Sequence, residues 1–139
     1  MLQVLTLTGI GLVTTALLDA LWLGLVMHEF YKVQLGPIAR MTGDSMTPIW
    51  PAATLVYVAV VTGIQLFVLP RVADTAPAAS GLAWGALFGL VVYGLYDLTN
   101  YATLNRWSLV LTVVDIAWGA AICGSTTAIL ALARRWLRS

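Results

Sequence analysis

Four long stretches of mostly apolar residues dominate the hydropathy pattern along the chain, separated by short segments that hold most of the charged residues. The hydrocarbon core of a bilayer is about 30 Å thick, which takes about 20 residues of α-helix to cross. Each stretch is long enough, and an isolated strand would leave its backbone polar groups unpaired in lipid. The pattern therefore predicts four membrane-spanning helices at about residues 2–27, 49–69, 79–104 and 108–133.

Little of the chain remains for anything else. Fewer than a third of the 139 residues lie outside the predicted spans, divided among three loops and two ends. A soluble domain needs a core of its own, which such short segments cannot build. We therefore expect an all-α integral membrane four-helix bundle in which residues 1–139 form a single polytopic domain.

The composition excludes several other classes of protein. Hydrophobic residues make up 60% of the chain and charged residues only 9%, with a mean hydropathy of +0.92. Soluble domains carry roughly 25% charged residues. The formal net charge of +1 gives no basic excess for nucleic acid, so we expect membrane lipids and no nucleic acid as partners. One cysteine and one histidine offer neither an internal disulfide nor a zinc ligand set, so no metal site is predicted.

The basic residues bear on the orientation in the membrane. An even number of spans puts both termini on one side, together with Arg71, Arg134, Arg135 and Arg138. The other side would hold Lys32, Arg40 and Arg106. Because cytoplasmic segments carry an excess of Lys and Arg, we expect both termini in the cytoplasm.

Three aspartates at one depth are the most specific feature of the sequence. Asp19, Asp97 and Asp115 each lie about 7 or 8 residues inside the end of a predicted span, roughly 10–12 Å into the bilayer. Tyr57 has the same depth on the second span, and Asn100 follows one turn after Asp97. Ionisable groups inside spans usually face the bundle interior. We therefore predict that these five side chains meet in one polar chamber in the outer half of the membrane.

Small and aromatic residues share the helix faces that carry the aspartates. Residues four apart on a helix lie along one ridge, and small residues on a ridge let helices approach closely in membranes. The sequence thus predicts helix-packing positions at Gly81, Gly85, Gly89 and Gly119. Three aromatic residues lie within reach of the predicted chamber: Trp22, Tyr93 and Trp118.

Two interpretations of the aspartates stay open. No Lys or Arg lies within a predicted span, so at least one carboxyl must be neutral or the chamber must hold a cation. In the functional interpretation, the chamber binds a proton, a cation or a substrate. In the structural interpretation, the carboxyl groups only hydrogen-bond neighbouring helices.

Several short strings resemble the signature of a known family. They are Asp19–Gly24, Phe30-Tyr31, Leu35-Gly36, Tyr96–Asn100, Ala102–Leu104 and Asp115–Gly119. Together they resemble a bacterial family of predicted membrane proteins catalogued as domain of unknown function 2177. The resemblance implies a small multi-pass protein of the bacterial cytoplasmic (inner) membrane. It implies no activity, no catalytic residue and no cofactor.

Three functions are compatible with these features. We favour a non-catalytic accessory or assembly subunit, bound to other membrane subunits or to further copies of the chain, because almost no mass lies outside the bilayer. One alternative is a proton- or cation-coupled small transporter that acts as an oligomer. The other is an intramembrane enzyme that uses paired aspartates as acid and base.

Overall fold

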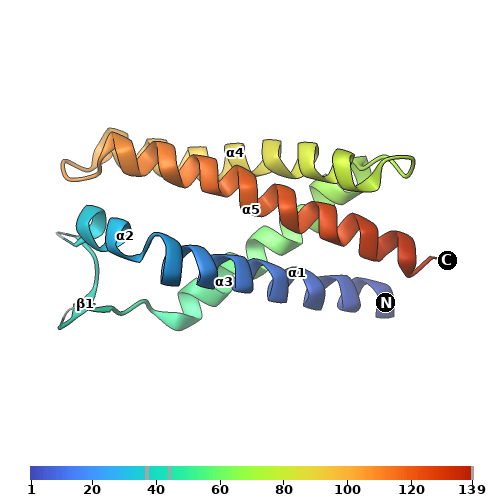
Figure 1. The fold of residues 1–139 in the computed structure, drawn as a ribbon, viewed down its shortest axis with the longest axis horizontal. Helices are drawn as coiled ribbons and strands as arrows, with labels where there is room; N and C mark the ends of the chain where they lie inside the picture. Colours follow the sequence, from blue (N-terminus) through green and yellow to red (C-terminus); the bar gives the residue numbers. More distant parts are fainter. Residues whose placement is uncertain (37, 44, 139) are drawn as a thin grey trace.

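The computed structural model describes residues 1–36, 38–43 and 45–138 and is almost entirely helical (Figure 1). Its described residues include four helices long and apolar enough to cross a membrane: Leu2–Val26, Trp50–Arg71, Pro77–Thr103 and Leu109–Trp136. Each coincides with a predicted span to within a few residues. The all-α four-helix membrane fold predicted from the hydropathy pattern is therefore confirmed.

The elements follow one another in a simple order. They are α1 (Leu2–Leu21), η1 (Trp22–Val26), α2 (His28–Leu35), β1 (Met41–Thr42), β2 (Ser45–Met46), α3 (Trp50–Gly63), η2 (Ile64–Val68), η3 (Leu69–Arg71), α4 (Pro77–Thr103) and α5 (Leu109–Trp136). The segments η1 and η2 are π-helical turns that continue α1 and α3, and η3 is a short 3₁₀ turn. The two short strands pair antiparallel, around Gly43 at a φ of 60°.

The long helices differ in how closely they pack. Figure 1 shows α4 and α5 lying side by side along their length, with α1 beside α5 and α3 crossing obliquely. The chain ends lie at one end of the bundle, and α2 and the strands lie at the other. Both termini are thus on one side, as an even number of spans requires, while their cytoplasmic placement stays a prediction.

Helix α5 is longer than the predicted span. It runs to Trp136, so that Arg134 and Arg135 occupy its last turn and do not follow its end. An arginine at a span end can bury its methylene chain while its guanidinium reaches the interface. The span predicted from hydropathy ends at Ala133 because the charged residues that follow lower the hydropathy, although the backbone remains helical.

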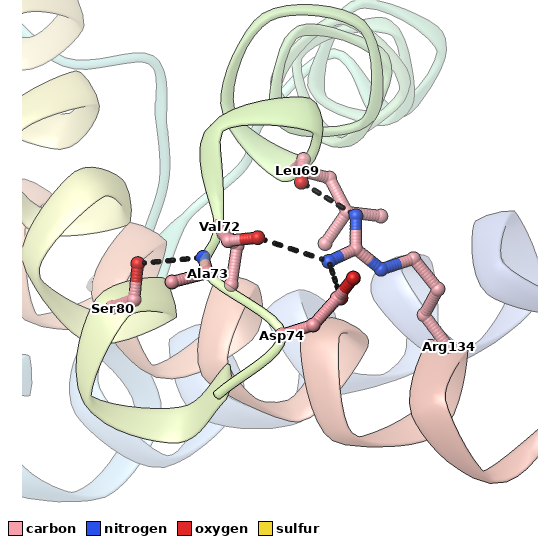
Figure 2. A network of polar contacts seen from close by, with 6 residues as sticks. All are labelled: Leu69, Val72, Ala73, Asp74, Ser80 and Arg134. Atoms are coloured by element: carbon pink, nitrogen blue, oxygen red, sulfur yellow. Dashed lines mark hydrogen bonds and ion pairs between the residues drawn. The ribbon is translucent and has the colours of Figure 1, made fainter. Parts of the chain in front are cut away.

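At the end of the bundle that carries the termini, the side chain of Arg134 connects α5 to the segment that follows η2 (Figure 2). Its guanidinium donates to the carbonyl oxygens of Leu69 at 2.6 Å and Val72 at 3.3 Å, and pairs with Asp74 Oδ1 at 3.3 Å. These carbonyls lie where the second span, Trp50–Arg71, ends and the loop to α4 begins. The Leu69 carbonyl also accepts from the Val72 backbone N–H at 3.3 Å, and the arginine adds charged donors at this helix end, where carbonyls lack regular helical partners.

The opposite end of the bundle is closed by α2. After the π-helical turn η1, Met27 leaves helical geometry with a φ of −118°, and α2 then lies at the beginning of α5. There Tyr31, Trp107 and Leu111 form a small buried cluster against Trp22 and other apolar side chains. A larger apolar cluster fills the rest of the bundle between α1, α3 and α5.

Candidate functional site

The glycines of α4 set its distance from α5. A Cβ added at Gly81 would lie 2.9 Å from Ala128 Cα, and one at Gly85 or Gly89 would meet a backbone carbonyl oxygen of α5. On α5, Gly119 leaves the space that the ring of Tyr93 occupies. All four predicted packing glycines thus lie in the interface between α4 and α5. The absence of a side chain at Gly119 leaves room for the ring of Tyr93 against α5.

Asp19 is held by an indole from α5. Asp19 is only 7% exposed, and its Oδ1 accepts a hydrogen bond from Trp118 Nε1 at 2.7 Å. The side chain of Tyr57 approaches the same carboxyl group from α3. The carboxyl therefore has polar partners on two neighbouring helices.

Asp115 is held by a phenol from α2. The hydroxyl of Tyr31 donates to Asp115 Oδ1 and accepts a hydrogen bond from Trp22 Nε1 at 3.3 Å. The rings of Trp22 and Trp118 stack with centroids 4.5 Å apart and planes within 4° of parallel. One continuous set of contacts therefore joins the two carboxyl groups through stacked indoles.

Asp19 and Asp115 line one pocket of about 270 Å³. Its remaining walls are aromatic or aliphatic: Leu23, Tyr31, Leu35, Met46, Tyr93 and Trp118. The lining comes from α1, η1, α2, β2, α4 and α5, so the pocket exists only when these elements are assembled. We call it the carboxylate pocket.

Asp97 has a different environment. It is 0% exposed, and the indole of Trp107 lies next to it. Within the described part of the chain, neither carboxyl oxygen completes a hydrogen bond, nor do Trp107 Nε1 and Asn100 Nδ2. A buried polar group without a partner costs about 1–3 kcal/mol, so this cluster is an expensive feature of the fold.

The structure places part of the predicted chamber in the carboxylate pocket. Asp19 and Asp115 share a pocket with Tyr93 and Trp118, and Trp22 stacks behind it. Asp97, Asn100 and Tyr57 do not line that pocket as the described residues form it. Asp97 lies one turn after Tyr93 on the same ridge of α4, beside Trp107 and outside the lining of the pocket.

The described residues also give no metal-ligand set. No three His, Cys, Asp or Glu side chains among them come close enough to hold a metal ion. The three carboxyl groups, although matched in depth, do not form such a set.

Tyr31 is the site residue that the depth argument missed. Twelve residues separate it from Asp19, which on a straight helix would rotate it about 120° away. The π-helical turn η1 and the break at Met27 change this rotation and bring Tyr31 to Asp115. The available signal was the Phe30-Tyr31 string of the family signature, which the resemblance included without giving it a role.

Because of the environment of Tyr31, the stability of the folded protein varies with pH in the alkaline range. Burial and the hydrogen bond to Asp115 raise the pKa of Tyr31 above its ordinary value of 10.0. The folded protein therefore holds this proton more tightly than the unfolded chain does. Its contribution to stability is complete below about pH 10 and declines as the pH rises further.

We expect Tyr31→Phe to destabilise the protein by about 1–3 kcal/mol at neutral pH, because it removes a hydrogen bond to a charged group. Above about pH 10 the wild-type protein should lose part of this advantage. Thermal unfolding in detergent across that pH range measures both effects. Tyr101→Phe, at a position 46% exposed on α4, is the control. Parallel curves for wild type and Tyr31→Phe at all pH values would contradict the assigned linkage.

These features define a small polytopic membrane protein whose helices enclose an acidic, aromatic-lined pocket at one end. The chain belongs to the family described as predicted membrane proteins, DUF2177, whose model matches residues 4–132. The family resemblance seen in the short strings is therefore confirmed. No curated protein and no solved structure matches the chain.

Proposed function

We propose that this membrane protein binds a small organic cation, with an ammonium group and an apolar body, in the carboxylate pocket. The observation that supports the proposal is that Asp19 and Asp115, from different helices, line one pocket whose other walls are aromatic and aliphatic. Because two carboxylates in one partly desolvated pocket repel each other, a cation between them offsets that repulsion.

The lining fits both parts of such a ligand. Carboxylates attract the ammonium group, and the rings of Trp118, Tyr31 and Tyr93 line the pocket, where aromatic quadrupoles favour a cation. Leu23, Leu35 and Met46 offer aliphatic contacts for the apolar body. A volume of about 270 Å³ limits the ligand to roughly the size of one ring with a quaternary ammonium group.

This proposal develops the small-transporter alternative. Binding an organic cation in a membrane is the first step of cation-coupled transport, with the bacterial cytoplasmic membrane as the proposed location and both termini inside. The accessory or assembly role favoured from the sequence is the competing proposal, in which the carboxyl groups only hold helices together. For the paired-aspartate enzyme we have no specific supporting observation, since an indole or a phenol engages each carboxyl group.

Binding of benzyltrimethylammonium, followed by intrinsic tryptophan fluorescence of the detergent-purified protein, tests the proposal. We expect saturable binding, weakened about tenfold or more in Asp19→Asn and in Asp115→Asn, because each substitution removes a charge that faces the ligand. Its neutral carbon analogue neopentylbenzene should bind at least tenfold more weakly than the cation. Glu29→Gln, an exposed acid at the same end of the bundle, should bind like wild type.

The competing role predicts a different set of results. If the wild-type protein does not bind the cation, or binds the neutral analogue equally well, the organic-cation proposal is wrong. Unchanged affinity in both Asp→Asn variants would also contradict it. Helix content and elution volume, measured for every variant, separate loss of the site from loss of the fold.

A further inference from the structure

A second pocket lies at the opposite end of the bundle, where the chain ends meet the end of the second span. It measures about 280 Å³ and is lined in part by Arg134 and Arg138, by the amides of Gln3 and Gln65, and by Val4 and Leu7. The elements that form it are the beginning of α1, the segments η2 and η3, and the end of α5. We call it the terminal groove.

The charge around the terminal groove is positive. Arg71, Arg134, Arg135 and Arg138 all belong to this end, and Asp74 is its acidic side chain among the described residues. Arg134 is already engaged by two carbonyls and Asp74, and Arg71 donates to the carbonyl of Phe67. Within the described part of the chain, the guanidinium of Arg138 has no hydrogen-bond or ion-pair partner, although Arg138 lines the groove.

The groove combines polar side chains with an apolar wall from α1. Arg138 and Gln3 lie near the chain ends, whereas Val4 and Leu7 lie further along α1, with Val4 59% exposed and Leu7 buried. The neighbouring side chains of Leu2, Val4 and Leu5 are 59–79% exposed, as lipid-facing residues of a span are. An anionic group joined to an apolar chain matches this arrangement, and a free anion would use only its polar part.

We infer that the terminal groove binds the headgroup of an anionic phospholipid from the surrounding bilayer. The phosphate is placed at Arg138, since a guanidinium presents paired donors that match phosphate oxygens. The amide of Gln3 is positioned to serve the glycerol or ester oxygens, and the acyl chain begins against Val4 and Leu7. This site is independent of the carboxylate pocket and of its proposed ligand.

Native mass spectrometry of the detergent-solubilised protein, titrated with phosphatidylglycerol or phosphatidylcholine, tests the inference. We expect phosphatidylglycerol to bind about fivefold or more tightly than phosphatidylcholine, and Arg138→Gln to remove most of this preference. Arg135→Gln is the matched control. It makes the same change of charge three residues earlier on α5, at an exposed position that does not line the groove.

The outcomes separate a built site from general electrostatic attraction. An equal loss of phosphatidylglycerol in Arg135→Gln and Arg138→Gln would show diffuse attraction to basic residues and overturn the inference. So would equal binding of the two lipids by the wild-type protein. Glycerol 3-phosphate serves as the soluble competitor. If it displaces phosphatidylglycerol at a comparable concentration, the groove binds a free phosphate compound, and the proposal of a lipid ligand is wrong.

Discussion

Gly89→Ala is expected to force α4 and α5 apart and to destabilise the protein by about 3 kcal/mol or more. The added Cβ would overlap the carbonyl oxygen of Gly119 and lie 2.9 Å from the backbone nitrogen of Ala120. Backbone atoms of a helix cannot rotate aside as a side chain can. The measurement is thermal unfolding in mild detergent, with helix content followed by circular dichroism.

Gly94→Ala is the matched control for this change. It lies on the same helix five residues further on, and its added Cβ would meet only Ile116 Cδ1 at 4.0 Å, an ordinary contact. Alanine is favoured over glycine inside a helix by about 0.8–1 kcal/mol, so this variant should unfold at the same temperature or higher. Equal stability of the two variants would show that the α4–α5 interface is not set by close backbone approach.

The sequence predicts the fold well because the bilayer restricts it. Length and hydropathy define each span, and lipid permits little besides a helix once a segment must cross. The ridge of Gly81, Gly85 and Gly89 also identifies the face of α4 that meets α5, because its spacing of four follows the helix repeat. These properties depend on one helix at a time.

The carboxylate pocket could be predicted only in part, because it depends on rotations between elements. Counting residues from a span end gives the depth of Asp19 and Asp115 but not the direction in which they point. The π-helical turn η1 has no strong sequence signal, and it determines that Tyr31 reaches Asp115. Asp97 has a matching depth, yet the ridge of α4 turns it toward α5 and Trp107.

Arg134 shows the same limit at the other end of the bundle. From the sequence it is one of several basic residues that indicate topology, equivalent to Arg135. In the structure its guanidinium reaches back to Leu69 and Val72, more than sixty residues earlier in the chain. Only the packing of α5 beside η3 distinguishes the two arginines.

Arg134→Gln is therefore expected to destabilise the protein by about 2–3 kcal/mol, whereas Arg135→Gln should change its stability by less than about 0.5 kcal/mol. The substitution removes the charged donor from the Leu69 and Val72 carbonyls, which lie at the end of the second span (Figure 2). The ion pair itself adds little, because the side chain of Asp74 is 80% exposed. Thermal unfolding compares the two variants under identical conditions.

Hydrogen exchange locates the effect, and a lysine variant separates geometry from charge. Amides of the loop between η3 and α4 should exchange faster in Arg134→Gln, while those of the carboxylate pocket should be unchanged. Arg134→Lys should recover less than half of the lost stability, since an ammonium group lacks the planar fork that reaches two carbonyls at once. Full recovery with lysine would mean that positive charge alone stabilises this end, and that the hydrogen bonds to Leu69 and Val72 contribute nothing measurable.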